Sequence, residues 1–515
     1  MCINQHDVLE RNHQVGIMGS VYSNSACAFI WLGPGDEDSD RALSFIDSLQ
    51  QILLEHVPGR DAKEILPKYI DLPEDMVLPS DDQAWAELEA LLWRPWFHRS
   101  WTVQEPILAP NRMIACGSKI RGWYTFLNAV HVSLHFRRHE ETLIRILPFL
   151  AIHMSICQKS EGLRLSDLII TNWEREASDP RDKVYALYGL VQGHQEVPLE
   201  ISYAMSVEDI YKSTVRFCIE NEASLSILAH VSQFRNQSDL PSWVPDWRDR
   251  PNSGCRPVKS SDNEDFHASS RSRPLLGPSF SNDKLTLKGF ILAIVERTIK
   301  TGALRFNPAE SSPDSWITNA SAAGVPVRFL QGKIFQTSYD LTIVAEFSPF
   351  HKYGIPTARL TWPNSSRWLA AGSQTPIPQA VWREHMAEVQ GRTEGRCLFL
   401  TKDSLGLAPA PTQVGDRVCI LLGGDAPFIL RPRQNMARTT PSKEAKPKRQ
   451  STPKTTPQGI TKPRPQGSRK SARVAKQALE ATEWTLIGDC YLNEYMHGEA
   501  METATEADYV NFTLV

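Results

Sequence analysis

The sequence lacks any closely spaced pair of cysteines, although it contains nine cysteines in 515 residues. They stand singly and far apart, and no C-x-x-C pair occurs among them. This pattern argues against a disulfide framework and against a zinc knuckle. We therefore expect most of these cysteines to be small, buried hydrophobic residues.

Long apolar runs are also missing. No stretch reaches the roughly 18 consecutive apolar residues that a membrane-spanning helix needs, and no charged and then apolar leader opens the sequence. An apolar fraction of 41% and fourteen tryptophans argue for globular structure over most of the chain. Its length suggests roughly two to four domains. We expect an intracellular protein without a membrane span, located in the cytoplasm or, as an alternative, in the nucleus.

The net charge of −3 conceals one strongly basic segment. Between Arg431 and Glu480 we count about fourteen Lys and Arg against two Glu, so this stretch carries roughly +12. It is rich in Pro, Ser, Thr and Gln and has no aromatic residue, so it cannot bury enough apolar surface to fold. Residues 434–480 are thus predicted to be a disordered basic insertion. Nuclear import or weak nucleic-acid contact is one interpretation, and a solvated linker is the other.

Strand-like sequences border this insertion on both sides. Residues 427–431 precede it and residues 484–491 follow it, so the insertion is predicted to loop out between two paired strands. Further strands are expected over residues 284–295, 396–401 and 416–422. Together they predict a β-rich C-terminal module that comprises residues 281–433 and 481–515. The Pro- and Ser-rich stretch over residues 231–280 is expected to be a linker.

The first 230 residues have the pattern of an α/β domain with a helical extension. A helix over residues 6–25, an almost entirely apolar strand over 26–32 and a helix over 39–54 follow one another. Such a strand is typical of a parallel sheet that is covered on both faces. The remaining expected elements are a strand over 112–116 and helices over 82–93, 100–108, 122–136, 142–158, 163–173, 181–191 and 206–220.

One segment combines aromatic and charged residues densely. Trp96 and Trp101 supply apolar surface, while Arg99 and Glu105 are polar groups close to them in the sequence. In a structural interpretation the aromatic residues anchor a helix and the charged groups pair. In a functional one, burial beside apolar walls raises the pKa of Glu105 and prepares it for acid/base work.

A second charged block, Asp179-Pro180-Arg181-Asp182, precedes the helix expected over 181–191. Asp179 is the expected helix cap, Pro180 suits the first turn, and Asp182 favours the helix dipole. In the functional alternative, Arg181 and Asp182 reach back to the segment around Glu105.

No metal site is expected. His131, His135 and His139 share one face of a helix, which is the spacing that allows two imidazoles to bind zinc. However, Arg137 and Arg138 lie between them and no H-E-x-x-H pattern occurs nearby. We interpret them as part of an exposed polar helix face.

Four blocks occur in a fixed order and together resemble the fungal heterokaryon-incompatibility (HET) domain. They are CINQHDVLERNHQV at 2–15, AFIWLG at 28–33, RPWFHRSWTVQE at 94–105 and DPRDKVYALYGL at 179–190. LPSWVPDW at 240–247 resembles the junction that often follows this domain. The family's own first strand is not found before Met1, so we expect a chain that is truncated within the domain.

The resemblance implies a fold and a site. The HET domain is similar to the Toll/interleukin-1 receptor-like sandwich, a parallel sheet flanked by helices, here with its first strand missing. Relatives of that fold include enzymes that cleave the glycosidic bond of NAD with one catalytic Glu. By this fold-level analogy Glu105 is the catalytic candidate. The ligand-binding candidates are Asn4, Gln5, Asp7, Arg99, Arg181 and Asp182, the first three of which are expected near the carboxyl edge of the strands.

Three hypotheses about function follow from the resemblance. The first is an allorecognition effector that triggers growth arrest or cell death when a protein partner carries a non-self signal, with no cofactor required. It includes self-association into a homo-oligomer. The second is a glycohydrolase with NAD as its substrate, acting as the death trigger. The third is an inactive truncated remnant, because a missing strand leaves a sheet edge open.

Overall fold

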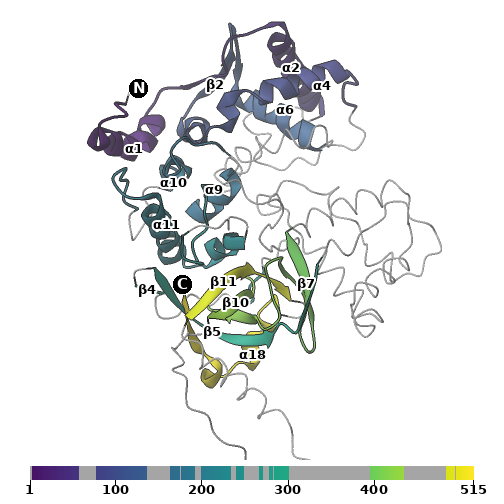
Figure 1. Ribbon diagram of the computed structural model, residues 1–515. Coiled ribbons are helices and arrows are strands. Elements are labelled where there is room, and N and C mark those ends of the chain that lie inside the picture. The colour runs from purple at the N-terminus through teal and green to yellow at the C-terminus, as the bar shows by residue number, and fades with distance from the viewer. Residues whose placement is uncertain are drawn as a thin grey trace, which may run out of the picture.

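The computed structural model describes residues 3–56, 77–135, 163–173, 175–191, 199–232, 239–248, 266–270, 278–281, 283–300, 395–433, 483–492 and 495–515. The helix expected over 142–158 and the basic insertion expected over 434–480 lie outside these ranges. Figure 1 shows an α/β part at the top, a helical middle and a β-rich part below it. None of the helices in these ranges is long and apolar enough to span a bilayer.

The α/β part is built on a three-stranded sheet. Its elements are α1 (Val8–Ser23), β1 (Ala28–Trp31), α2 (Glu37–His56), α4 (Asp82–Leu92), β2 (Arg112–Cys116), β3 (Lys119–Gly122) and α6 (Trp123–His135). β1 pairs in parallel with β2, and β2 pairs antiparallel with β3. α2 and α6 pack against each other and on the sheet, and α4 packs against α2. The expected order of helix, parallel strand and helix is therefore present.

The prediction that the first strand is covered on both faces is wrong for the described residues. Along β1, buried and exposed side chains alternate. Ile30 is fully buried, whereas Phe29 is 59% exposed and Trp31 is 54% exposed. Successive residues of a strand point to opposite faces. An all-apolar run therefore does not reveal whether one or both faces are covered.

The strand β3 is not among the predicted elements, because it is short and contains two cations and a glycine. It forms because Gly117 and Ser118 make a two-residue turn that returns the chain along β2. Gly117 has a φ of +55°, and a Cβ atom there would lie 2.7 Å from Cα of Gly35. Only glycine is compatible with both constraints.

The helical middle joins the α/β part to the β-rich part. It consists of α9 (Leu165–Asn172), α10 (Asp182–Tyr188), α11 (Val207–Glu222) and the 3-10 turn η4 (Ser226–Ser232). The hydroxyl of Ser206 accepts a hydrogen bond from the amide of Asp209 and so caps α11. Tyr188 of α10 and Phe217 of α11 meet edge to face at 5.9 Å between ring centroids. These helices lie within 2 residues of the predicted bounds at most ends, which is the usual uncertainty of helix termini.

The β-rich part contains a closed ring of strands and a second sheet. Its elements are β4 (Ser279–Ser281), β5 (Lys284–Ile294), β6 (Arg297–Lys300), β7 (Arg396–Leu400), β8 (Leu405–Pro409), β9 (Arg417–Leu421), β10 (Phe428–Arg433), β11 (Glu483–Asp489), β12 (Tyr491–Leu492), α18 (Glu499–Thr503), η6 (Glu506–Asp508) and β13 (Val510–Leu514). β13, β11, β10, β9 and β5 are neighbours in that order, and β13 also pairs with β5. This pairing closes a small barrel, which removes the edges of those strands. The second sheet has the order β12, β8, β7, β6.

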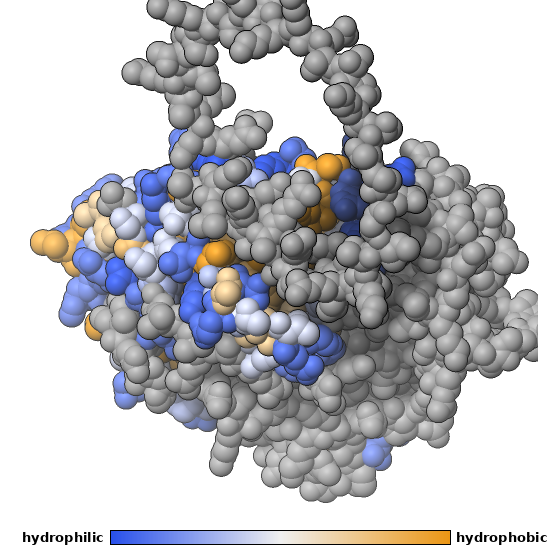
Figure 2. Space-filling view, turned by 90° about the horizontal axis from the view of Figure 1, so that it is seen from below, coloured by the Kyte–Doolittle hydropathy of each residue, from blue (hydrophilic) through white to orange (hydrophobic). Residues whose placement is uncertain are grey.

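The predicted pairing of the strands that border the insertion is confirmed. β10 and β11 run antiparallel, and Arg433 at the end of β10 lies opposite Glu483 at the start of β11. The chain therefore leaves and re-enters the barrel at adjacent positions. In Figure 2, which views the molecule from below, the described surface is mainly hydrophilic with a few separate hydrophobic patches.

The described part of the expected linker is built into the core. Trp243 is 1% exposed, and its indole N–H donates to the carbonyl of Asp283 at 3.0 Å. The amide of Ser242 donates to the carbonyl of Val515, and the Ser242 hydroxyl accepts from the amide of Leu486. One continuous hydrophobic core runs from the helices into the barrel.

Candidate functional site

Glu105 lies in a tightly turned segment next to the sheet. Two 3-10 turns, η2 (Pro95–His98) and η3 (Ser100–Val103), precede the short helix α5 (Gln104–Leu108). The hydroxyl of Thr102 is hydrogen-bonded to the carbonyl oxygens of both Trp96 and Arg99, at 2.9 and 2.7 Å. The helix expected over 100–108 is thus divided into a 3-10 turn and an α-helical turn. This local folding places Glu105 against α1.

Both carboxylate oxygens of Glu105 have a donor. The indole N–H of Trp96 donates to Oε2 at 3.0 Å. The hydroxyl of Tyr22, from the last turn of α1, donates to Oε1 at 3.5 Å. The first contact has the length of a normal hydrogen bond and the second is long. The carboxylate is therefore fixed chiefly by Trp96 and covered by Tyr22.

Burial raises the pKa of Glu105 above its ordinary value. The hydrogen bond from Trp96, the charge of Arg99 and the hydroxyl of Tyr22 oppose this rise without cancelling it. Burial and the nearby carboxylate also raise the pKa of Tyr22, so its phenol stays a protonated donor. A carboxyl group with a raised pKa can take up or release a proton closer to neutral pH.

Arg99 and Gln104 flank this carboxylate in different ways. The Arg99 side chain is exposed, and its charge acts on Glu105. Gln104 is buried, and its side-chain amide donates to the carbonyl of Ala186 at 2.8 Å. Gln104 therefore connects α5 to α10. Among the sequence candidates, Arg99 is the one whose charge reaches Glu105.

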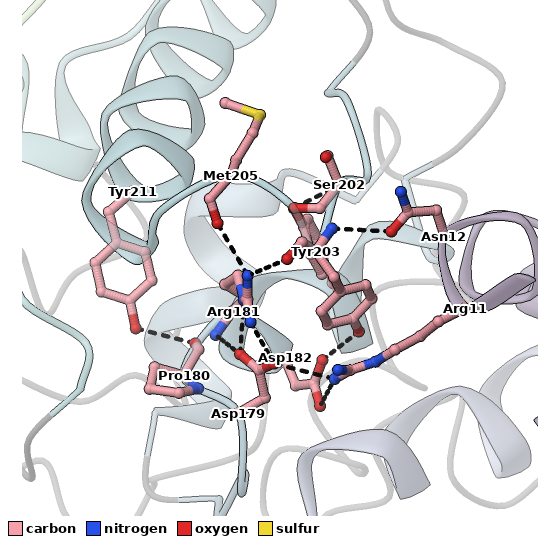
Figure 3. Close-up of polar contacts among 11 residues, drawn as sticks. Arg11, Asn12, Asp179, Pro180, Arg181, Asp182, Ser202, Tyr203, Met205 and Tyr211 are labelled. Atoms are coloured by element: carbon pink, nitrogen blue, oxygen red, sulfur yellow. Dashed lines mark hydrogen bonds and ion pairs between the residues drawn. The ribbon is translucent and has the colours of Figure 1, made fainter. Parts of the chain in front are cut away.

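The second charged block forms a separate cluster, drawn in Figure 3. Two nitrogens of the Arg181 guanidinium, Nε and Nη2, each donate to an Asp179 oxygen at 2.9 Å. Its third nitrogen, Nη1, donates to the carbonyls of Tyr203 and Met205 at 2.6 and 2.9 Å. Arg181 thus ties the chain around residues 203–205 to the residues before α10.

Asp179 does not cap α10 as expected. The helix begins at Asp182, its N-cap residue is Arg181, and no side chain caps it. The Asp179 carboxylate instead accepts from the amide and guanidinium of Arg181. Burial by itself would raise the pKa of Asp179, but these hydrogen bonds and the charges of Arg181 and Arg11 hold it below its ordinary value.

Asp182 is the buried carboxylate of this cluster, with its side chain 10% exposed. It accepts hydrogen bonds from the hydroxyl of Tyr203 and from the side chain of Trp101. Burial raises its pKa, and these two donors oppose the rise only in part. Since Trp101 belongs to the segment that carries Glu105, Asp182 does reach back to that segment. Arg181 does not take part in this connection.

Arg11 of α1 completes the cluster. Its guanidinium lies 3.1 Å from Asp179 and 3.8 Å from Asp182, and its central carbon is 3.4 Å from the centroid of the Tyr203 ring. The neighbouring Asn12 accepts a hydrogen bond from the amide of Tyr203 at 2.8 Å. One end of α1 is therefore bound to the Asp179–Asp182 block, as Figure 3 shows.

The other three ligand candidates belong to the start of α1. Asp7 is the N-cap residue and accepts from the amides of Leu9 and Glu10. The side-chain oxygen of Asn4 accepts from the backbone amide of His6, and the backbone amide of Asn4 donates to the carboxylate of Glu10. Asn4, Gln5 and Asp7 are all exposed. In the described structure the contacts of Asn4 and Asp7 serve the helix end, and none of them involves Glu105.

α1 connects the buried carboxylate of Asp182 with the half-buried one of Glu105. Arg11 contacts Asp182 near the start of the helix, and Tyr22 contacts Glu105 near its end. A separation of eleven residues corresponds to about three helical turns, so Arg11 and Tyr22 lie on the same face. Glu105 thus accepts from the indole of Trp96 and the phenol of Tyr22. Asp182 accepts from the indole of Trp101 and the phenol of Tyr203.

Sequence reasoning missed three of the residues that build this arrangement. Arg11 and Tyr22 were predicted only as parts of the helix over 6–25, and Tyr203 was not among the predicted site residues. The spacing of Arg11 and Tyr22 could have shown that both side chains lie on one face of the helix. No sequence signal identified their partners.

Among the described residues, no group of three or more His, Cys, Asp or Glu is arranged to hold a metal ion. The side chains of His131, His135 and His139 lie outside that description. The chemistry that the described groups offer is proton transfer and hydrogen bonding by two carboxyl groups, the buried Asp182 and the half-buried Glu105.

Comparison with known proteins identifies the segment that carries Glu105. Residues 1–105 match the sequence model of the family described as heterokaryon incompatibility protein (HET). The chain carries a HET domain. The matched segment extends from the start of the chain to Glu105, so it includes α1, β1 and the η2–η3 turns. The Asp179–Asp182 block lies beyond the match and packs onto it.

One relative extends the similarity of this HET-domain chain. It is the heterokaryon incompatibility protein 6, OR allele, of Neurospora crassa, which is 24% identical over 542 aligned residues. The alignment covers 84% of this chain and 77% of the relative, so it reaches well past the HET domain. No solved structure matches the chain.

Proposed function

We propose that this chain is a fungal heterokaryon-incompatibility effector. The single observation that carries the proposal is the HET match over residues 1–105, and the similarity to a heterokaryon incompatibility protein over 84% of the chain supports it. In this role the protein causes growth arrest or cell death when a partner protein carries a non-self signal. For the α/β part we propose a Toll/interleukin-1 receptor-like sandwich, supported by the parallel β1–β2 pair and the helices packed on it.

Expression in fungal strains tests this role. The gene is placed under an inducible promoter in a panel of strains that differ in their incompatibility alleles, and growth after induction is measured. We expect growth arrest in at least one allelic background and normal growth in the strain of origin. Equal growth in every background, with the protein detected at similar levels, would contradict the proposal.

A second candidate, an NAD glycohydrolase that acts as the death trigger, is favoured by one feature of the site. Burial raises the pKa of Glu105, as an acid/base residue requires. In this reaction water replaces nicotinamide on the ribose carbon of NAD, and Glu105 would hold or activate the attacking water. Positioned acid/base groups contribute about 10²- to 10⁴-fold in rate.

Turnover of NAD by the purified full chain tests the second candidate. We expect the wild type to release nicotinamide and Glu105→Gln to lose about 10²-fold or more of that rate. Glu220→Gln, at a half-buried glutamate of α11 that pairs with Arg216, is the matched control and should retain it. Equal turnover by wild type and Glu105→Gln excludes Glu105 as the catalyst. No turnover by any form favours a scaffold whose signal is carried by contacts alone.

A further inference from the structure

α1 is attached to the protein with little buried apolar surface: Val15 belongs to the core, and Met18 packs half-buried against it. Of its 16 residues only Val15 and Gly19 are buried. Val8, Leu9 and Ile17 are exposed, with Leu9 at 80%. Figure 1 shows α1 at the periphery of the molecule, beside α10. Burial of apolar surface therefore supplies little of the free energy that keeps this helix in place.

Along the attached stripe of α1, polar contacts stand at both ends, and Val15 and Met18 pack against the core between them. Arg11 contacts Asp179 and Asp182 at one end, and Tyr22 contacts Glu105 at the other. Between them, Gly19 packs directly on the backbone of α10's C-terminal end: a Cβ atom at position 19 would lie 3.0 Å from the carbonyl oxygen of Gly189. Such polar contacts exchange for contacts with water at small net cost.

The side chains beneath this stripe are two carboxylates, Asp182, which is buried, and Glu105, which is half-buried. The Arg11 guanidinium lies over the Tyr203 ring, whose hydroxyl donates to Asp182, and Tyr22 covers Glu105. We propose that α1 is a strap, meaning a helix that undocks as a unit from α5 and α10 and thereby opens Glu105 and Asp182 to solvent. The inference rests on the proposed function in one respect, because it takes the undocked form as the active state of the effector. A partner that binds the undocked helix more tightly than the docked one shifts this equilibrium.

Hydrogen–deuterium exchange of the full chain tests the undocking. α11 also has 16 residues and serves as the internal reference. We expect α1 amides of the wild type to exchange at least roughly ten-fold faster than α11 amides, because a weakly packed element opens without global unfolding. Arg11→Gln should accelerate exchange in α1 by about another ten-fold, since it removes a charge-assisted contact. Tyr22→Phe, at the opposite end of the helix, should accelerate it to a smaller extent.

Arg216→Gln is the matched control. It removes an arginine–carboxylate pair of similar length, 3.0 Å to Glu220, but this pair lies within α11 and is exposed. Exchange in α1 should not change. If α1 and α11 exchange together in the wild type, in Arg11→Gln and in Tyr22→Phe, the helix is part of one cooperative unit and the strap is refuted.

Carboxyl labelling tests whether the strap covers the acids. A water-soluble carbodiimide with an amine nucleophile modifies accessible carboxyl groups, and mass spectrometry locates the product. We expect Glu105 and Asp182 to be labelled faster in Arg11→Gln than in the wild type or Arg216→Gln. Faster exchange in α1 without faster labelling of these two residues would overturn the proposed uncovering.

Growth assays separate the strap from the proposed function. In a compatible strain, Arg11→Gln should arrest growth, whereas the wild type and Arg216→Gln should not. If the wild type arrests growth in an incompatible strain but Arg11→Gln is silent in the compatible one, the switch is refuted and the effector role stands. If no form arrests growth in any strain, the effector role and the switch fail together, and the exchange data still decide whether α1 undocks.

Discussion

α1 and α11 have the same length of 16 residues and similar beginnings, yet they are anchored very differently. Asp7 caps the first and Ser206 caps the second, each by accepting backbone N–H groups. α11 buries seven residues, namely Ile210, Tyr211, Thr214, Val215, Phe217, Cys218 and Ile219. α1 buries two. Capping therefore fixes where a helix begins, whereas the apolar stripe decides how firmly it is attached.

The largest effect should follow from removing a core side chain of α11. Phe217 is 3% exposed and packs against Tyr188. Phe217→Ala should lower the free energy of unfolding by about 3–5 kcal/mol, the usual cost of such a cavity. Leu9→Ala on the exposed side of α1 should change it by less than about 0.5 kcal/mol. Chemical denaturation of the full chain measures both, and similar losses would show that α1 is anchored as firmly as α11.

Two glycines within α1 offer an internal comparison of intermediate size. At Gly19 a Cβ atom would lie 3.0 Å from a backbone oxygen, whereas at Gly16 the nearest atom would be 3.9 Å away, at the end of the Ile201 side chain. Gly19→Ala should weaken docking of α1 by about 1–3 kcal/mol through overpacking. Gly16→Ala should stabilise the helix by about 0.5–1 kcal/mol, because alanine is the better helix former.

Amide exchange in α1 measures both glycine substitutions. The expected result is faster exchange in Gly19→Ala and slower exchange in Gly16→Ala, with α11 unchanged in both. Slower exchange in both variants would mean that the backbone of Gly189 does not restrict α1.

The smallest effect concerns pH and the acid beneath the end of α1. The raised pKa of Glu105 means that the folded state binds more protons than the unfolded state in the window above the ordinary pKa of glutamate. Its contribution to stability is therefore fully present below that window and is lost as pH rises through the raised pKa. Glu105→Gln removes this dependence. Thermal unfolding of both forms is measured from roughly pH 4 to pH 7. The unfolding temperature of the wild type should fall relative to that of Glu105→Gln as pH rises. A difference that stays constant with pH would contradict the raised pKa of Glu105.

Much of the secondary structure could be predicted from local patterns. The helix over 82–93 appears as Asp82–Leu92 and the helix over 206–220 as Val207–Glu222, because the spacing of apolar residues is a local property. The pairing of β10 with β11 was predictable too, since a polar, charged insertion between two apolar strands hardly constrains them. β3 escaped prediction because its formation depends on a glycine turn that meets Gly35, which is distant in sequence.

The candidate site was predictable only in its parts. The aromatic neighbours of Glu105 could be expected from the Arg94–Glu105 segment, and its raised pKa belonged to the functional one of the two interpretations given there; the structure places Trp96 on the carboxylate, and burial raises its pKa. Asn4, Gln5 and Asp7 were grouped with Glu105 by analogy, but the described contacts of Asn4 and Asp7 belong to the helix end. Residues of a shared motif can thus serve to cap a helix, by accepting hydrogen bonds from backbone amides, rather than to bind a ligand.

The amino-acid sequence by itself determined most of the helices, about half of the strands and the two charged blocks, because periodicity, capping and turn formation act over a few residues. Only the tertiary structure decided that Arg11 lies against Asp179, 168 residues away, and that Tyr22 covers Glu105. It also decided that the barrel closes through β13 and β5. Such contacts depend on how whole elements pack. They are also not equally strong for every element, since α1 buries two of its residues and α11 buries seven.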